Sequence, residues 1–156
     1  MVRRMHDAVT VHIKAAPESV WSLVSDVTRI GRYSPETFEA EWLDGATGPA
    51  LGAKFRGHVK RNGKGPIYWT TCTVTACEPG EVFAFGVGSA DKPLNVWRYD
   101  LAPNGDGTDV TESFTLAPTM PLRAYWFALG WARGKTNRRG MQATLEAIKS
   151  EVESAA

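Results

Sequence analysis

"WRYDLAPNGDGTDVTESFTL" (residues 97–116) contains two alternating segments joined by turn residues. Trp97 and Tyr99 share one parity before the turn, and Val110 and Phe114 share one parity after it. Alternate residues of a strand point to the same face, and the central letters NGDG favour a tight turn. The stretch therefore predicts a β-hairpin with one apolar face.

Five further segments upstream are predicted as strands, and turn residues separate most of them, so neighbouring strands are expected to pair antiparallel. Between the first and second strands, Pro17 fits a first helical position, and residues 16–36 predict two short helices. The predicted strands cover residues 7–13, 37–43, 52–61, 67–78, 81–88, 94–103 and 108–116.

The apolar period changes after Pro121. Met141, Leu145, Ile148 and Val152 are spaced by four, three and four residues, which indicates a narrow helical stripe. A curved antiparallel sheet can cover such a helix with its concave side. We therefore predict a single α+β domain over residues 1–156. Extending the stripe backwards places four more residues on the inward face: Phe127, Gly130, Gly134 and Asn137.

Composition sets limits on function. The 156 residues carry a net charge of +1, which gives no indication of a nucleic acid, polyanion or acidic lipid partner. There is no apolar segment long enough for a membrane helix and no signal-peptide pattern, so we expect a soluble, cytoplasmic protein without integral membrane contact. The three His are scattered, which predicts no metal site, and no dinucleotide fingerprint indicates a cofactor.

Strand parity predicts which side chains face the hollow between sheet and helix. They are mostly aromatic, with a few polar groups among them, as in a site for an apolar ligand. Gly130 and Gly134 would remove volume from the facing helix, and Tyr33 and Trp126 would border the entrance. The predicted binding residues are Tyr33, Phe55, Trp69, Thr71, Thr73, Phe85, Asn95, Trp97, Tyr99, Glu112, Phe114, Gly130, Gly134 and Met141.

Glu112 stands out because it shares the parity of Val110 and Phe114. A carboxylate in an apolar hollow is expected to have a raised pKa unless a cation or several donors approach it. Neutral Glu112 beside the Tyr99 hydroxyl could donate a proton to a ligand carbonyl or hydroxyl. The alternatives are a hydrogen-bond anchor for a loop and a charge at the rim.

Several segments together resemble the helix-grip fold of the START and birch-pollen-allergen (SRPBCC) superfamily, in particular its bacterial polyketide cyclase/dehydrase-like branch. They are "APESVWSLVSDVTRIGRYSPE" (16–36), "GPALGAKFRGH" (48–58), "WTTCTVTACEPGEVFAF" (69–85), the hairpin at 97–114 and "RRGMQATLEAIKSEVE" (138–153). The resemblance implies a sheet of about seven strands wrapped round a long C-terminal helix, with two short helices after the first strand. It also implies a cavity shared by lipid carriers, aromatase/cyclases, hormone receptors and chaperone activators.

Aromatase/cyclases of this fold have a motif similar to W-x-S-x-R on a central strand. Here Trp69 matches and Thr71 replaces the serine, but Thr73 stands where the arginine would be. The first hypothesis is therefore a monomer or homodimer that binds a hydrophobic small molecule such as a lipid or polyketide. The second is a polyketide cyclase/dehydratase-type enzyme with Glu112 as general acid/base and Tyr99 as hydroxyl donor. The third is a protein-interaction module.

One basic cluster remains outside these hypotheses. Arg133, Lys135, Arg138 and Arg139 lie in the predicted helix, where Lys135 and Arg139 are four residues apart and away from the apolar stripe. This pattern fits either a solvated helix face or contact with a phosphate or anionic headgroup.

Overall fold

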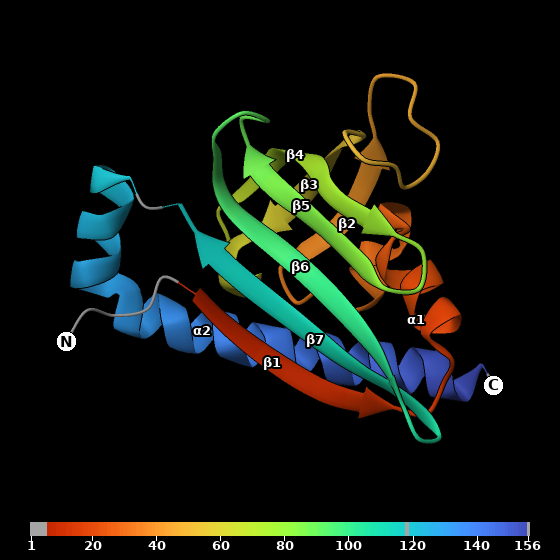
Figure 1. The fold of residues 1–156 in the computed structure, drawn as a ribbon. Helices are drawn as coiled ribbons and strands as arrows, with labels where there is room; N and C mark the ends of the chain where they lie inside the picture. The colour runs from red at the N-terminus through yellow and green to blue at the C-terminus, as the bar shows by residue number, and fades with distance from the viewer. Residues whose placement is uncertain (1–5, 118, 156) are drawn as a thin grey trace.

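The computed structural model describes residues 6–117 and 119–155, apart from the side-chain surroundings at positions 62, 120, 130, 131 and 134. Seven strands form one sheet, with a long C-terminal helix along it (Figure 1). The elements are β1 (His6–Ile13), α1 (Pro17–Val24), η1 (Val27–Arg32), β2 (Thr37–Trp42), β3 (Lys54–Lys60), η2 (Arg61–Gly63), β4 (Ile67–Glu78), β5 (Val82–Gly88), β6 (Pro93–Asn104), β7 (Gly107–Leu116) and α2 (Met120–Ser154).

The sheet order is β1-β7-β6-β5-β4-β3-β2, and every neighbouring pair is antiparallel. Consecutive strands from β2 to β7 are therefore neighbours, as the turn residues predicted. β1 closes the other edge beside β7. The curved seven-stranded sheet, the long C-terminal helix and the short α1 and η1 after the first strand confirm the predicted helix-grip architecture.

The β6–β7 hairpin brings two predicted site residues together. Asn104 pairs with Gly107, and Gly105 has φ +58°, a left-handed conformation that glycine adopts without a side-chain clash. This turn fixes the register of the two strands, in which Tyr99 lies directly opposite Glu112. The mutual position of these two residues is thus set by the backbone.

The helical stripe predicted from the apolar period forms the inner face of α2. Met141, Leu145 and Ile148 are at most 1% exposed, and Val152 is 8% exposed. This part of α2 packs against β1 and β7. The backward extension holds for Asn137, which is buried, but it is wrong for Phe127, which is 83% exposed.

Trp126 is buried where Phe127 was expected, and its ring lies 6.0 Å from that of Phe114. The buried position here thus lies one residue earlier in the sequence than the backward extension of the stripe predicts. The first turns of α2 also bend away from the rest of the helix, beyond the ends of β1 and β7 (Figure 1). Because of this bend, a single straight stripe does not describe the whole helix.

The inward parity predicted for β4 is wrong. Trp69 is 41% exposed and stacks on His58, with ring centroids 4.1 Å apart. Thr71 and Thr73 share its outward face, while Cys72 and Val74 are buried on the inner face. The strand is apolar on both faces, so alternation alone did not identify its inner face. The register does, because Cys72 pairs with inward-facing Phe55 of β3.

Candidate functional site

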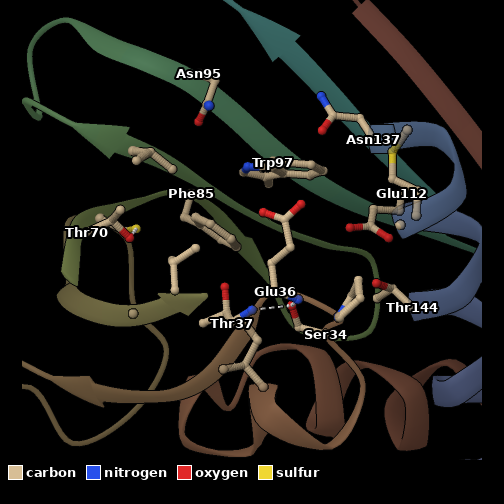
Figure 2. Close-up of a pocket in the computed structure, with 18 of the residues that line it drawn as sticks. Ser34, Glu36, Thr37, Thr70, Phe85, Asn95, Trp97, Glu112, Asn137 and Thr144 are labelled. Carbon is tan, nitrogen blue, oxygen red and sulfur yellow. Dashed lines mark hydrogen bonds between the residues drawn. The ribbon is translucent and has the colours of Figure 1, made fainter. Parts of the chain in front are cut away.

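A cavity of about 170 Å³ lies between the inner face of the sheet and α2, closed on one side by the segment before β2. Its wall combines aromatic and aliphatic side chains with several polar ones (Figure 2). The main apolar lining residues are Ile30, Phe55, Val59, Tyr68, Cys72, Phe85, Val87, Trp97 and Met141, and the polar ones include Glu36, Thr70, Asn95, Tyr99, Glu112, Arg133, Asn137 and Thr144.

Glu112 lines this cavity from β7 and is 5% exposed. The Tyr99 hydroxyl donates a hydrogen bond to its Oε1 atom at 3.3 Å. Burial raises the pKa of Glu112 from its usual 4.5 to about 8, although the Tyr99 hydrogen bond opposes the shift. Glu112 is therefore mostly protonated at neutral pH. Burial, and then the nearby Glu112 carboxylate, also raise the pKa of Tyr99.

Four buried polar atoms of the cavity wall have no hydrogen-bond partner in the described part of the chain. They are Glu112 Oε2, Asn95 Oδ1, and both Nδ2 and Oδ1 of Asn137. Asn137 is 4% exposed, and the labelled side chains of all three residues border one space in Figure 2. Buried polar groups in proteins are nearly always hydrogen-bonded, because leaving one unpaired costs about 1–3 kcal/mol. These atoms therefore mark positions where a bound molecule could form hydrogen bonds.

The wall also contains an ion pair between Glu36 and Arg133. Two guanidinium nitrogens of Arg133 donate to the two Glu36 carboxylate oxygens at 3.2 and 3.3 Å. Their side chains are 21% and 19% exposed, so the pair lies nearer to solvent than Glu112 does. The Thr37 amide donates to Ser34 Oγ at 3.0 Å and orders the segment that carries Glu36, whose carboxylate extends into the space below Trp97 (Figure 2).

The structure brings seven of the predicted binding residues to the cavity: Phe55, Phe85, Asn95, Trp97, Tyr99, Glu112 and Met141. Tyr33 and Phe114 are buried in the adjoining core and do not line it. Trp69, Thr71 and Thr73 lie on the other face of the sheet. Gly130 and Gly134 belong to α2, but their surroundings fall outside the described residues.

Sequence reasoning missed several polar lining residues. The Glu36–Arg133 pair was missed because Arg133 was assigned to a basic cluster, read as a solvated face or a contact for an anion, and Glu36 was only the last residue of the segment predicted as two short helices. Asn137 was placed on the inward helical face but was not named as a binding residue. Thr70 was missed with the β4 parity. Only the helical phase pointed to any of them, through Asn137.

Among the described residues, no group of three or more His, Cys, Asp or Glu is arranged to hold a metal ion. Within the same residues, none of the helices has the length and apolar character needed to cross a membrane. The residues that line the cavity come from the sheet, from α2 and from the segment between α1 and β2, which includes η1.

Solved structures with this architecture align with nearly the whole chain. A Polyketide_cyc-like protein from Corynebacterium glutamicum is 28% identical, with 98% of this chain and 94% of that chain covered and a TM-score of 0.61. A START superfamily protein from Mycobacterium smegmatis is 17% identical, with coverage of 97% and 99% and a TM-score of 0.71. An AHSA1-like protein from Aeromonas hydrophila is 21% identical, with coverage of 96% and 93% and a TM-score of 0.62. No curated protein matches the chain.

The family described as "Polyketide cyclase / dehydrase and lipid transport" matches residues 6–153. The chain belongs to this family. The family and the START-like fold of the neighbours confirm the resemblance drawn from the sequence.

Proposed function

We propose that this protein binds a small, mostly apolar molecule in the cavity between sheet and α2. The observation that carries the proposal is the set of four unpartnered polar atoms on Glu112, Asn95 and Asn137 in a wall that also presents many aromatic and aliphatic side chains. Apolar walls with a few converging polar groups are typical of small-molecule sites. Family membership supports the same class of function.

The volume of the cavity and the polarity of its wall limit the range of possible ligands. An apolar cavity of about 150 Å³ holds one benzene-sized molecule, and this cavity has about 170 Å³. The ligand part that fits beside Trp97 and Phe85 is therefore a single ring or a short branched chain. A larger ligand would extend past the Glu36–Arg133 pair toward solvent. Because neutral Glu112 presents a donor, a ligand carbonyl or hydroxyl oxygen is its matching acceptor.

Native mass spectrometry of the freshly purified protein tests the binding proposal. We expect an added mass of a small organic molecule that is released on denaturation. The matched variant is Asn137→Leu, which keeps a side chain of similar size but removes both amide atoms, and it should retain less of this molecule. Purified protein that carries no added mass and binds no member of a library of one-ring carbonyl and phenolic compounds would contradict the proposal.

A second candidate function is catalysis of cyclisation or dehydration, as the family description includes such enzymes. The observation that favours it is the pKa of about 8 at Glu112, which lies close to neutral pH, where a general acid/base is most effective. Glu112 would give its proton to the oxygen of a substrate carbonyl or leaving hydroxyl, and its carboxylate would later take a proton back. The Tyr99 hydroxyl would stabilise that carboxylate through the hydrogen bond to Oε1.

Glu112→Gln separates the two functions once the co-purified molecule or its precursor is known. In an enzyme, the substitution should lower the turnover rate by about a hundredfold or more while binding persists. In a binding protein, it should change affinity modestly, and the wild type should convert nothing. Asn95→Leu is the control, since it alters the polar wall without removing the acid.

A further inference from the structure

The net charge of +1 conceals a segregated charge distribution. Residues 60–64 and 120–139 contain eight of the 18 Lys and Arg but none of the 17 Asp and Glu. The rest of the chain thus contains the ten other Lys and Arg residues and all 17 Asp and Glu residues. The cations of the two segments are Lys60, Arg61, Lys64, Arg123, Arg133, Lys135, Arg138 and Arg139. We call these two segments the basic surface.

The two segments meet in the fold although about 60 positions separate them in sequence. A guanidinium nitrogen of Arg61, in η2, lies 3.5 Å from the Tyr125 hydroxyl oxygen in α2. Acids from other elements reach two of the eight cations, since Glu36 pairs with Arg133 and Asp7 pairs with Arg138. Within the described residues, the other six cations form no ion pair.

Large apolar side chains are exposed in the first turns of α2 and shortly after residues 60–64. Phe127 is 83% exposed and Leu129 is 54% exposed, both in the first turns of α2. Ile67, just after the η2 turn, is 56% exposed. These account for three of the seven large hydrophobic side chains found exposed in the described chain. Phe127 lies four residues after Arg123, so the two share one side of the helix, whereas Leu129 points to the other side. An exposed Phe beside cations on one helix face is characteristic of helices that lie at a membrane surface.

Local helix energetics do not explain this composition. Acidic side chains near the N-terminus stabilise a helix through its dipole, but the first turn of α2 has none. That turn contains Arg123, and the next acid in the chain after Glu112 is Glu146. The absence of acids over this stretch therefore has a cause outside helix stability.

We propose that the basic surface docks the protein peripherally on an anionic lipid bilayer. The six cations without an ion pair attract lipid phosphates, and the exposed Phe127 ring inserts among the headgroups and upper acyl chains. Phosphate contacts alone leave the Phe127 ring exposed, whereas a bilayer buries it, and this favours lipid over nucleic acid. The proposal goes beyond small-molecule binding and does not depend on it.

Vesicle co-sedimentation of the full chain tests this docking. We expect binding to vesicles of phosphatidylcholine with about one third phosphatidylglycerol, much weaker binding to phosphatidylcholine alone, and release at about 0.5 M NaCl. Lys135→Glu/Arg139→Glu should lower the vesicle partition coefficient by about tenfold or more. Phe127→Ser/Leu129→Ser should lower it several-fold while leaving the salt dependence intact.

Matched controls separate docking from unfolding and from general charge. Lys54→Glu/Lys92→Glu makes the same charge change at exposed positions outside the basic surface, and Leu51→Ser removes an apolar side chain that is 73% exposed. Both should bind vesicles like the wild type, and all variants should keep the wild-type circular dichroism spectrum and urea midpoint.

Three results would overturn the proposal. The first is equal partitioning into zwitterionic and anionic vesicles, or none into either. The second is binding of a DNA duplex at the same salt concentration that persists in Phe127→Ser/Leu129→Ser. The third is a wild-type homodimer that becomes monomeric in that variant, which would assign Phe127 and Leu129 to a subunit interface.

Discussion

Replacing Glu112 by Gln should remove a large pH dependence from the stability of the protein. In the folded chain the pKa of Glu112 is about 8 because the side chain is buried, whereas the group has its ordinary value of 4.5 when exposed. Below pH 4.5 the carboxyl group is neutral in both states. As pH rises above 4.5, the unfolded chain releases the proton first, so ionisation favours unfolding until the folded chain also ionises near pH 8.

The magnitude follows from the width of this window. Each pH unit within it lowers the free energy of unfolding by about 1.4 kcal/mol. Between pH 5 and pH 8 the wild type should therefore lose about 3.5 kcal/mol that the Gln variant keeps. Other titrating groups are common to both proteins, so they cancel in the difference between the two free energies of unfolding.

Urea denaturation followed by tryptophan fluorescence at pH 5, 6, 7 and 8 measures this difference. The free energy of unfolding of the Gln variant, relative to that of the wild type, should increase steadily from pH 5 to pH 8. Glu81→Gln, at an exposed position, is the control and should follow the wild type. A Glu112→Gln difference that stays constant within about 1 kcal/mol from pH 5 to pH 8 would refute the burial of a carboxyl group with a raised pKa.

Three further predictions concern the cavity wall, the packing of η1 against β2, and a buried thiol. Trp97→Ala should weaken binding of the retained ligand by at least about tenfold in fluorescence titration, because Trp97 lines the cavity. Trp69→Ala, on the outer face of β4, should leave the affinity unchanged. Equal losses of affinity in the two variants would contradict the orientation of β4. Gly31→Ala should lower the free energy of unfolding by about 2 kcal/mol or more in urea titration, because its Cβ would overlap a β2 carbonyl, while Gly48→Ala, with open space around it, should have little effect. Burial raises the pKa of the Cys72 thiol to about 12, so a disulfide reagent at pH 8 should modify it only after unfolding. The test uses the Cys77→Ser variant, because the Cys77 thiol is only partly buried, and rapid labelling of this variant in its native state would contradict the prediction.

Much of the architecture was predictable because its signals are local. The NGDG turn and the alternation on either side of it fixed the hairpin that pairs Tyr99 with Glu112, and a carboxylate in an apolar row identified the central polar group of the cavity. The spacing of Met141, Leu145 and Ile148 likewise defined the buried face of α2.

The wrong or missing predictions depend on tertiary relations that a linear pattern does not contain. Trp69 has the size and hydrophobicity of a core residue, but it stacks on its cross-strand partner His58 at the surface. Phe127 is 83% exposed near the start of α2. The first turns of this helix bend away from the rest, so the helical phase of later turns does not extend to them (Figure 1). Arg133 faces the cavity because Glu36, 97 residues away in sequence, pairs with it. A total charge near zero similarly hides where the cations gather.

Different parts of the C-terminal helix hold it in the core and line the cavity. Leu145, Ile148 and Val152 anchor one end of α2 in the core, while Asn137 and Met141 form part of the cavity wall toward the other end. Substitutions in the N-terminal half could therefore remodel the interior and its entrance while the anchored half continues to hold the helix in place. Amide hydrogen exchange should follow this division, with slow exchange around Leu145 and Ile148 and faster exchange toward the first turns. Such an arrangement would let one scaffold acquire new ligands through changes in a few helical turns.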